Sequence, residues 1–468
     1  MKSATNPSPK LLATAVILGV LSTSFSAIFL NIALPTMIKE LHIEASHSHW
    51  IVSVFITSST LSMLLVSSLI SQFSLRNTFI GSLLLFIAAS LIGASLNTLW
   101  PIIVCRALQG TAMGVLSVVA LITLFECYPI EKRGHAGAVF GLGVAMGPTL
   151  GPTLSGIIVD LWGWRATFYT PLILAISSLI LCWKILPART VNTTKKLDKA
   201  GFILLTIILF GLLGGISYLQ QRHWPNQQSL VFFVMLALLL TVLWQHQKRC
   251  QQPLLLITLF RHGGFNAAAV VSFVYGMGLW GSAFFLPLYL QQAIGLSVWD
   301  TGMVMLPSGL LLCLILPLGG RMADRLPARV VVSLGLTALG SSFLLMGLEI
   351  AKTSFILLAL FIAISRGLGL GIMIPSLDAT ATRALPSEKM NEGVAMMNFL
   401  RQLGGALSPT LLMLLLQWRI SANTVLMPAT IDKAMQAGYH QSLLGLGSLF
   451  MLSVLAAWRL PKQGYSTK

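Results

Sequence analysis

Residues 100–126 read WPIIVCRALQGTAMGVLSVVALITLFE, and this stretch decides the class of fold. It is almost entirely apolar, and the only charge inside it before Glu126 is Arg106. An α-helix crosses the hydrocarbon core of a bilayer with about 20 apolar residues. The strict alternation of apolar and polar residues that marks a barrel strand is absent here. The stretch is therefore predicted to be a membrane-spanning helix.

Thirteen further stretches have the same character, and the connections between them are too short to hold a soluble domain. Hydrophobic residues make up 56% and charged residues 9% of the chain, whereas an average soluble domain has about 25% charged residues. We predict an all-α integral membrane protein, with the longest connection at 418–440. The fourteen predicted spans are 11–35, 49–71, 78–96, 100–126, 135–160, 167–186, 200–220, 229–246, 265–290, 301–320, 329–349, 354–377, 392–417 and 441–459.

The basic residues predict the orientation of these spans. With the N-terminus in the cytoplasm, 21 of the 30 Lys and Arg residues fall in inner segments, six in outer segments and three within spans. Such a bias is what the positive-inside rule describes. It predicts a multi-pass protein with both termini cytoplasmic, and we expect its membrane to be a bacterial-type plasma membrane. It also explains the net charge of +17 without a nucleic-acid partner, because the basic residues are scattered between apolar runs.

Several other classes of function find no support in the sequence. The five cysteines form no CxxC pair, so neither a disulfide framework nor a thiolate metal site is indicated. No GxxxxGK[ST] loop for ATP is present. The His residues lie almost entirely outside the spans, and the group His42, Glu44, His47 and His49 fits no strong metal pattern. We expect no cofactor, no metal and no enzyme activity.

An internal repeat relates the fourth span to the twelfth. The first contains Arg106-x-x-Gln109-Gly110 and leaves through Pro129-x-Glu131-Lys132, and the second contains Arg366-x-x-Gly369 and leaves through Pro386-x-Glu388-Lys389. Two repeated halves around a central site are found in many secondary transporters. The repeat predicts an N-terminal six-helix half at 1–186, a linker and inserted helix pair at 187–264, and a C-terminal six-helix half at 265–468.

Seven motifs in order give the chain a resemblance to the major facilitator superfamily, in particular to its fourteen-span drug:proton antiporter branch. They are Leu30-Asn31-Ile32-Ala33-Leu34-Pro35, Arg106-x-x-Gln109-Gly110, Gly143-x-x-x-Gly147-Pro148-x-x-Gly151-Pro152, Asp198-x-x-Gly201, Pro253 to Arg261, Gly320-x-x-x-Asp324-Arg325-x-x-x-Arg329, and Asn398-x-x-Arg401-Gln402-x-Gly404-Gly405. The resemblance implies an exporter that works as a monomer by alternating access and proton exchange.

The resemblance also implies roles for two groups of motif residues. The glycines and prolines from Gly143 to Pro152 would form a flexible interface that controls cavity opening, and helix packing is the alternative. Asp324, Arg325 and Arg329 would form a cytoplasmic latch, and solvated loop charges are the alternative. The first-half copy of this latch is missing, because Ser67, Ser71 and Gln72 stand where the motif has Gly, Asp and Arg.

Proton-coupled transport needs a group whose protonation changes during the cycle, and a buried carboxylate is the usual choice. The branch often has an Asp in the first helix where this chain has Ser26. Glu126 and Asp378, near the inner ends of the fourth and twelfth spans, are the best candidates, although pairing with Lys132 or Arg383 is an alternative. Arg106 is implicated in proton coupling by resemblance, together with Gln109, and a structural tie to carbonyls is its alternative.

The centre of the membrane is expected to hold Arg106, Arg366 and Arg401 and no carboxylate. Such a site favours anionic or zwitterionic cargo, so a dedicated exporter of an anionic metabolite or siderophore is the alternative to a multidrug antiporter. The predicted cavity lining, for which packing or lipid contact is the alternative, comprises Asn31, Tyr275, Trp280, Phe284 and Asn398. Small molecules, protons and the lipid bilayer are the expected partners.

Overall fold

The computed structural model describes residues 9–41, 45–186, 197–220, 227–261, 263–348, 354–383, 385–386, 389–426 and 431–460. Every regular element in these ranges is a helix, and they contain no strand. The outer-loop residues 42–44 and the side chains of His47 and His49 lie outside what is described. The α-helices are α1 (Pro9–Glu40), α2 (Ala45–Met63), α3 (Val66–Ser95), α4 (Leu99–Cys127), α5 (Arg133–Trp162), α6 (Ala166–Ile185), α7 (Lys199–Gln220), α8 (Gln227–Arg249), α9 (Gly263–Gly276), α10 (Ser282–Leu288), α11 (Val298–Arg325), α12 (Ala328–Gly347), α13 (Phe355–Ile362), α14 (Leu370–Arg383), α15 (Met390–Leu426) and α16 (Ile431–Ala457).

Five short elements join these helices. Two are 3₁₀ turns, η1 (Ile130–Lys132) and η2 (Ile257–Arg261), and three are π-helical, η3 (Met277–Gly281), η4 (Tyr289–Ala293) and η5 (Ala363–Gly369). The π-helical segments lie inside two long helical runs, α9 to η4 and α13 to α14. Such wide turns often occur at functional sites.

Each predicted span coincides with helix. Eleven of the described helices are long and apolar enough to cross a membrane, or twelve if the bent α5 counts as one span. Two shorter apolar helices, Trp50–Met63 and Lys199–Leu212, lie over the second and seventh predicted spans. The number fourteen therefore stays a prediction. The predicted long connection at 418–440 is wrong, because α15 continues to Leu426 and α16 begins at Ile431.

Ser74 separates the second and third predicted spans within the range of α3. Its φ of 73° and ψ of 160° interrupt the helix and produce a kink at this residue. A positive φ is uncommon for a residue other than glycine. The Ser74 Oγ accepts a hydrogen bond from the Asn77 amide at 3.4 Å, which partly compensates for the strain at this turn.

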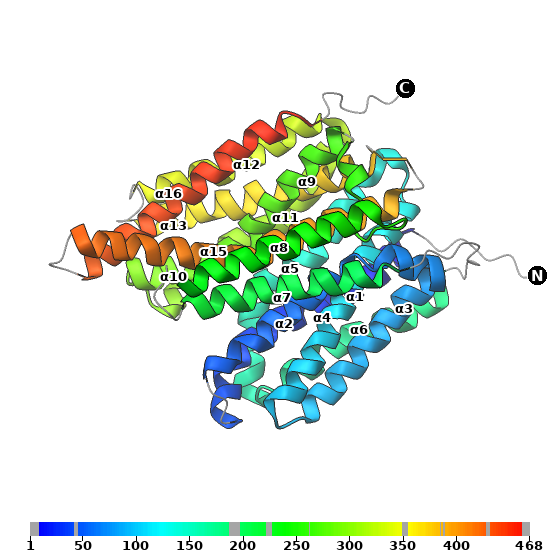
Figure 1. The fold of residues 1–468 in the computed structure, drawn as a ribbon, viewed down its shortest axis with the longest axis horizontal. Coiled ribbons are helices and arrows are strands. Elements are labelled where there is room, and N and C mark those ends of the chain that lie inside the picture. The colour runs from blue at the N-terminus through cyan, green and yellow to red at the C-terminus, as the bar shows by residue number, and fades with distance from the viewer. Residues whose placement is uncertain are drawn as a thin grey trace, which may run out of the picture.

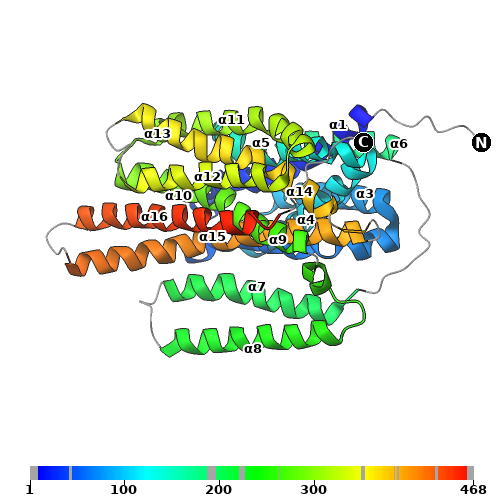
Figure 2. The same ribbon diagram turned by 90° about the horizontal axis from the view of Figure 1, so that it is seen from above.

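The helices form two groups that meet at one end. In Figure 1, α1 to α6 and α9 to α16 converge on the side of the two chain termini and diverge on the opposite side. Helix α5 packs against α11 and α14, and α2 packs against α15. Helices α7 and α8 lie to one side of both groups in Figure 2, and α7 contacts α2 and α15.

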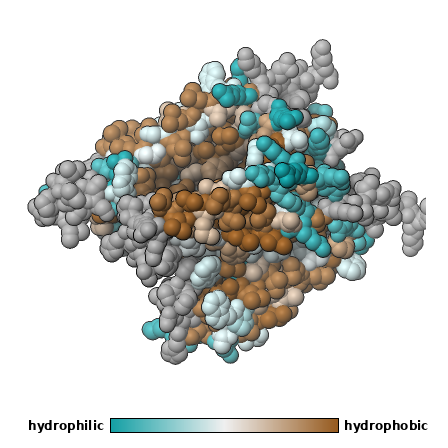
Figure 3. All heavy atoms as spheres, viewed as in Figure 1, coloured by the Kyte–Doolittle hydropathy of each residue, from teal (hydrophilic) through white to brown (hydrophobic). Residues whose placement is uncertain are grey.

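The surface agrees with a membrane location. In Figure 3 most described residues on this face are hydrophobic, and the hydrophilic ones gather toward the end where the termini lie. Helix α8 exposes large apolar residues along its length, including Leu230, Met235 and Leu238. Exposed apolar surface of this extent on a helix is stable only against lipid or another protein.

Candidate functional site

Arg401 on α15 and Asp378 on α14 form a buried ion pair. The Nη2 of Arg401 donates to Oδ1 of Asp378, and the two residues are 6% and 2% exposed. Arg401 Nη1 also donates to the Asn398 Oδ1 at 3.4 Å, and the guanidinium lies 5.7 Å from the centre of the Tyr275 ring. Removing one partner of such a pair would leave an uncompensated charge in a low-dielectric region.

Arg366 belongs to the same polar cluster. It is buried in the π-helical segment η5. Tyr275 on α9 lies within electrostatic reach of Arg366, Arg401 and Asp378, so the helices place these groups near one another. One expectation is corrected here. The expected absence of a carboxylate near these arginines is wrong, because Asp378 pairs with Arg401.

Arg106 on α4 is held in the other half by neutral groups. Its side chain is completely buried. The Nε donates to the Ile51 carbonyl at 3.3 Å, and Nη1 donates to the Ser26 carbonyl at 3.3 Å and to the Gln109 Oε1 at 3.0 Å. The guanidinium also lies 3.9 Å from the centre of the Phe55 ring. These hydrogen bonds tie Arg106 to two backbone carbonyls, the structural alternative to a role in proton coupling.

The two candidate carboxylates differ in their surroundings. Glu126 is exposed in the last turn of α4, whereas Asp378 is buried. A Cβ atom at Gly137 of α5 would lie 3.2 Å from the Pro375 Cα and 3.7 Å from the Asp378 Cβ. Asp378 therefore lies where α5 of the first half covers α14 of the second. This arrangement distinguishes two residues that the repeat had placed in equivalent positions.

The structure brings only part of the predicted cavity lining to this cluster. Tyr275 and Asn398 are buried beside Arg401. Trp280 is half-buried and its ring packs against the backbone at Gly405, and Phe284 is 40% exposed. Asn31 is half-buried on α1, and its Oδ1 has no hydrogen-bond partner among the described residues. No contact found in the described residues joins Asn31 or Phe284 to the ion pair.

The glycines of α5 pack against α1. A Cβ atom would lie 3.2 Å from Val20 at Gly143, 2.7 Å from the Ser24 carbonyl at Gly147, and 2.7 Å from Ile28 at Gly151. Each partner follows the last by four residues, so one face of α5 lies along one face of α1. Pro148 is half-buried on the same helix, and the Pro152 side chain is outside the described set.

Asp324 joins the two halves where the end of α11 meets the start of α5. The Oδ1 of Asp324, at the end of α11, accepts from the Gly134 amide at 2.8 Å, and Oδ2 accepts from the His135 amide at 3.2 Å. These amides open α5, and a helix N-terminus attracts negative charge. Arg325 is exposed beside Asp324, and Arg329 is half-buried in the first turn of α12. Gln402 adds a second link between the halves, because its Nε2 donates to Ser59 at 3.3 Å.

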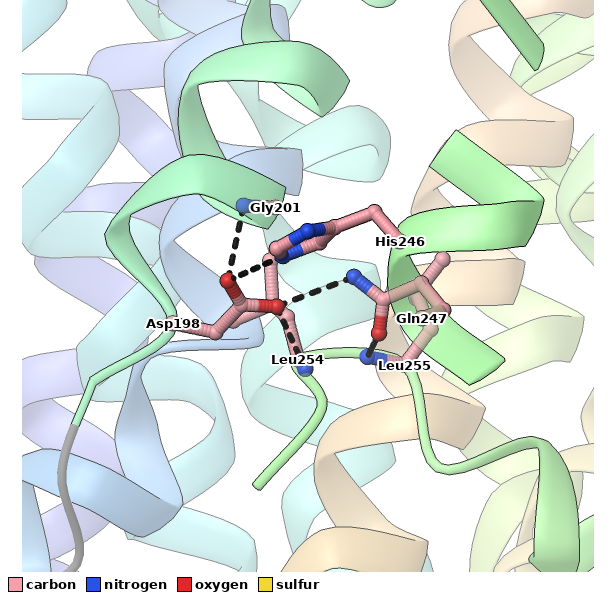
Figure 4. A network of polar contacts seen from close by, with 6 residues as sticks. All are labelled: Asp198, Gly201, His246, Gln247, Leu254 and Leu255. Carbon is pink, nitrogen blue, oxygen red and sulfur yellow. Dashed lines mark hydrogen bonds and ion pairs between the residues drawn. The ribbon is translucent and has the colours of Figure 1, made fainter. Parts of the chain in front are cut away.

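A polar network centred on Asp198 was missed as a site by the sequence analysis. Asp198 precedes α7, and its carboxylate accepts from the Gly201 and Leu254 amides and from Gln247, and contacts the His246 Nε2 at 2.8 Å (Figure 4). Burial raises the pKa of Asp198, but these hydrogen bonds outweigh burial, and its pKa lies below the ordinary value of 3.8.

The Asp198 network braces the inserted helix pair rather than fitting a metal. The possible ligand atoms of Asp198, His246 and Cys250 lie within 4.8 Å of one another. Both carboxylate oxygens, however, already serve as acceptors within the network. Asp198 also lines a cavity of about 440 Å³ between residues 64–68, 251–256 and 389–396. The network therefore ties the start of α7, the end of α8 and the segment at 254–255 to one another.

Comparisons with known proteins agree with this fold. The model of the Major Facilitator Superfamily matches residues 16–409. The lincomycin resistance protein LmrB of Listeria innocua is 26% identical over 92% of this chain and 88% of its own length. The multidrug export protein EmrB of Haemophilus influenzae is 25% identical over 86% and 79%. The crystal structure of the human organic anion transporter MFSD10 (TETRAN) superposes with a TM-score of 0.67 at 16% identity, covering 96% of this chain and all of that one.

Proposed function

We propose that this chain, which belongs to the Major Facilitator Superfamily, exports a small amphipathic compound by alternating access in exchange for protons. Transport itself follows from the family and the relatives, whereas direction, cargo and coupling are the proposal. Export is supported by relatives named for multidrug export and lincomycin resistance. We assign the moving halves to 1–186 and 265–468, with 187–264 as the inserted linker and helix pair.

The buried ion pair of Asp378 and Arg401 is the observation that carries proton coupling. An ionised carboxylate in a low-dielectric region needs its partner, and protonation removes that need. Helix α5 covers Asp378 at Gly137, so separating the halves at the inner end would give Asp378 access to the cytoplasm. Protonation of one residue would thus be linked to the position of α5. Alternating access is the movement of such halves around a central site.

The test is uptake into inverted membrane vesicles with an imposed pH gradient. The wild-type protein is expected to accumulate lipophilic cations, and collapse of the gradient is expected to release them. Asp378→Asn is expected to abolish gradient-driven accumulation while downhill exchange of the same cations persists. Glu126→Gln is the matched control, since this carboxylate is exposed at the equivalent place in the repeat, and it should accumulate cations normally.

Persistent uphill transport by Asp378→Asn would place the coupling group elsewhere. Because the substitution leaves Arg401 buried without its carboxylate partner, it can also destabilise the protein by about 3–5 kcal/mol. The double variant Asp378→Asn with Arg401→Gln removes both charges and separates the two effects. It should fold better than the single variant and still lack gradient-driven accumulation.

A dedicated exporter of an anionic metabolite or siderophore is the second candidate. It is favoured by Arg106, which is completely buried and whose described hydrogen-bond acceptors are all neutral, and by the buried Arg366. In the same vesicles this function predicts accumulation of amphipathic organic anions and not of cations. Reversing the charge of Arg366 should then abolish anion transport selectively, and unchanged anion transport would exclude this candidate.

A further inference from the structure

A groove of about 290 Å³ lies between α3 and α6, away from the polar cluster. Its lining comes from one face of α3 and from the end of α6, and it consists of Arg76, Asn77, Ile80, Gly81, Leu84 and Trp183. The groove belongs to the inner end of the first half, where the chain has just turned at Ser74. Neither the ion pair nor the contacts between the halves use these residues.

One end of the groove is polar and basic. Arg76 Nη2 donates to the Trp183 carbonyl at 2.6 Å, and the guanidinium lies 5.8 Å from the centre of the Trp183 ring. Its Nε is buried and has no hydrogen-bond partner among the described residues. Lys184 adds a second exposed positive charge next to Trp183. Residues 66–95 and 166–186 contain no Asp or Glu, so neither helix supplies a carboxylate to neutralise this end.

The other end of the groove is apolar and open. Arg76, Ile80 and Leu84 are spaced by four residues, so they follow one face of α3 over about 12 Å. A Cβ atom at Gly81 would meet nothing within 4 Å, and Leu84 is 48% exposed. The groove thus changes from basic to apolar along the direction that leads from the end of the helix toward the membrane centre.

We propose that this groove binds an anionic phospholipid of the adjoining leaflet. The phosphate lies against Arg76, and one acyl chain lies along Gly81 and Leu84. Arginine donates charge-assisted hydrogen bonds to phosphate, tryptophan is typical of the headgroup level, and basic pockets between membrane helices hold anionic headgroups. The inference concerns lipid binding alone and does not depend on the cargo or coupling proposed above.

The test is native mass spectrometry of the full-length protein in detergent, titrated with phosphatidylglycerol or with phosphatidylcholine of the same chains. The wild-type protein is expected to bind phosphatidylglycerol about tenfold more tightly, because only this lipid has a net negative charge for the basic end. Arg76→Gln should remove this preference. Gly81→Leu keeps the charge but fills the groove, and it should weaken binding of both lipids.

Arg459→Gln is the matched control, since Arg459 is an exposed arginine just after the end of α16 and lines no part of this groove. It should bind phosphatidylglycerol as the wild-type protein does. The proposal is wrong if Arg76→Gln keeps the preference, or if Gly81→Leu binds both lipids at wild-type strength. Complete displacement of the lipid by millimolar glycerol phosphate would also overturn it, because the site would then bind a free phosphate rather than a lipid.

Discussion

Replacing Asp324 by Asn should weaken the contact between α11 and α5 at the end where the two helix groups converge (Figure 1). The carboxylate of Asp324 accepts two backbone hydrogen bonds, from Gly134 at 2.8 Å and from His135 at 3.2 Å, and faces the N-terminus of α5. Asn keeps one acceptor but loses the second and the charge. A hydrogen bond to a charged group contributes about 1.5–3 kcal/mol, and the helix terminus about 0.3–1 kcal/mol.

Asp324 is half-buried, so solvent reduces these values, and we expect a net loss of about 1–2 kcal/mol. This corresponds to a roughly 5- to 30-fold shift toward the state in which the inner end is open. Spin labels at Ile130 and Leu326, both exposed near the contact, would report the shift as a larger long-distance population in pulsed electron resonance of a cysteine-free variant.

Asp300→Asn provides the control for this experiment. Asp300 lies at the other end of the same helix, α11, and its hydrogen bonds are with Ser297, the residue that caps this helix. It should leave the distance distribution between the labels unchanged. If Asp324→Asn also leaves it unchanged, the contact with α5 does not hold the inner end closed, and the argument from its geometry fails.

Two further predictions concern stability. Gly147→Ala should lower the free energy of unfolding of the detergent-solubilised protein by about 1–3 kcal/mol, because the new Cβ would lie 2.7 Å from the Ser24 carbonyl. Gly156→Ala should be neutral or slightly stabilising, because nothing lies within 4 Å of its Cβ position. Equal melting temperatures for the two variants would contradict close packing of α5 on α1. Asp198→Asn should lower the free energy of unfolding by about 1–2 kcal/mol near pH 7. Since the pKa of Asp198 is lowered in the folded state, its contribution is present above pH 3.8 and is lost as the pH falls through the lowered pKa, so the gap between variant and wild-type melting temperatures should narrow in that range and not at higher pH.

The apolar helices could be located from the amino-acid sequence, apart from the ends of α15 and α16. The predicted spans fall on helical residues, although 49–71 is divided between α2 and α3, because the demand for about 20 apolar residues is local and can be recognised without knowing what the helix packs against. The same holds for the glycines at 143, 147 and 151, whose spacing alone places them on one face. The arginines at 106, 366 and 401 were also identifiable, since a charge inside an apolar run stands out.

Which of these groups contact one another became visible only in the packed helices. Glu126 and Asp378 looked equivalent along the chain, but one is exposed and the other is buried against α5 and paired with Arg401. The contact from Asp324 to the first turn of α5 joins residues about 190 positions apart. Burial and pairing depend on how whole helices pack against one another, and hydropathy along one helix does not contain that information. For this reason the sequence located the charges, while the fold assigned their partners.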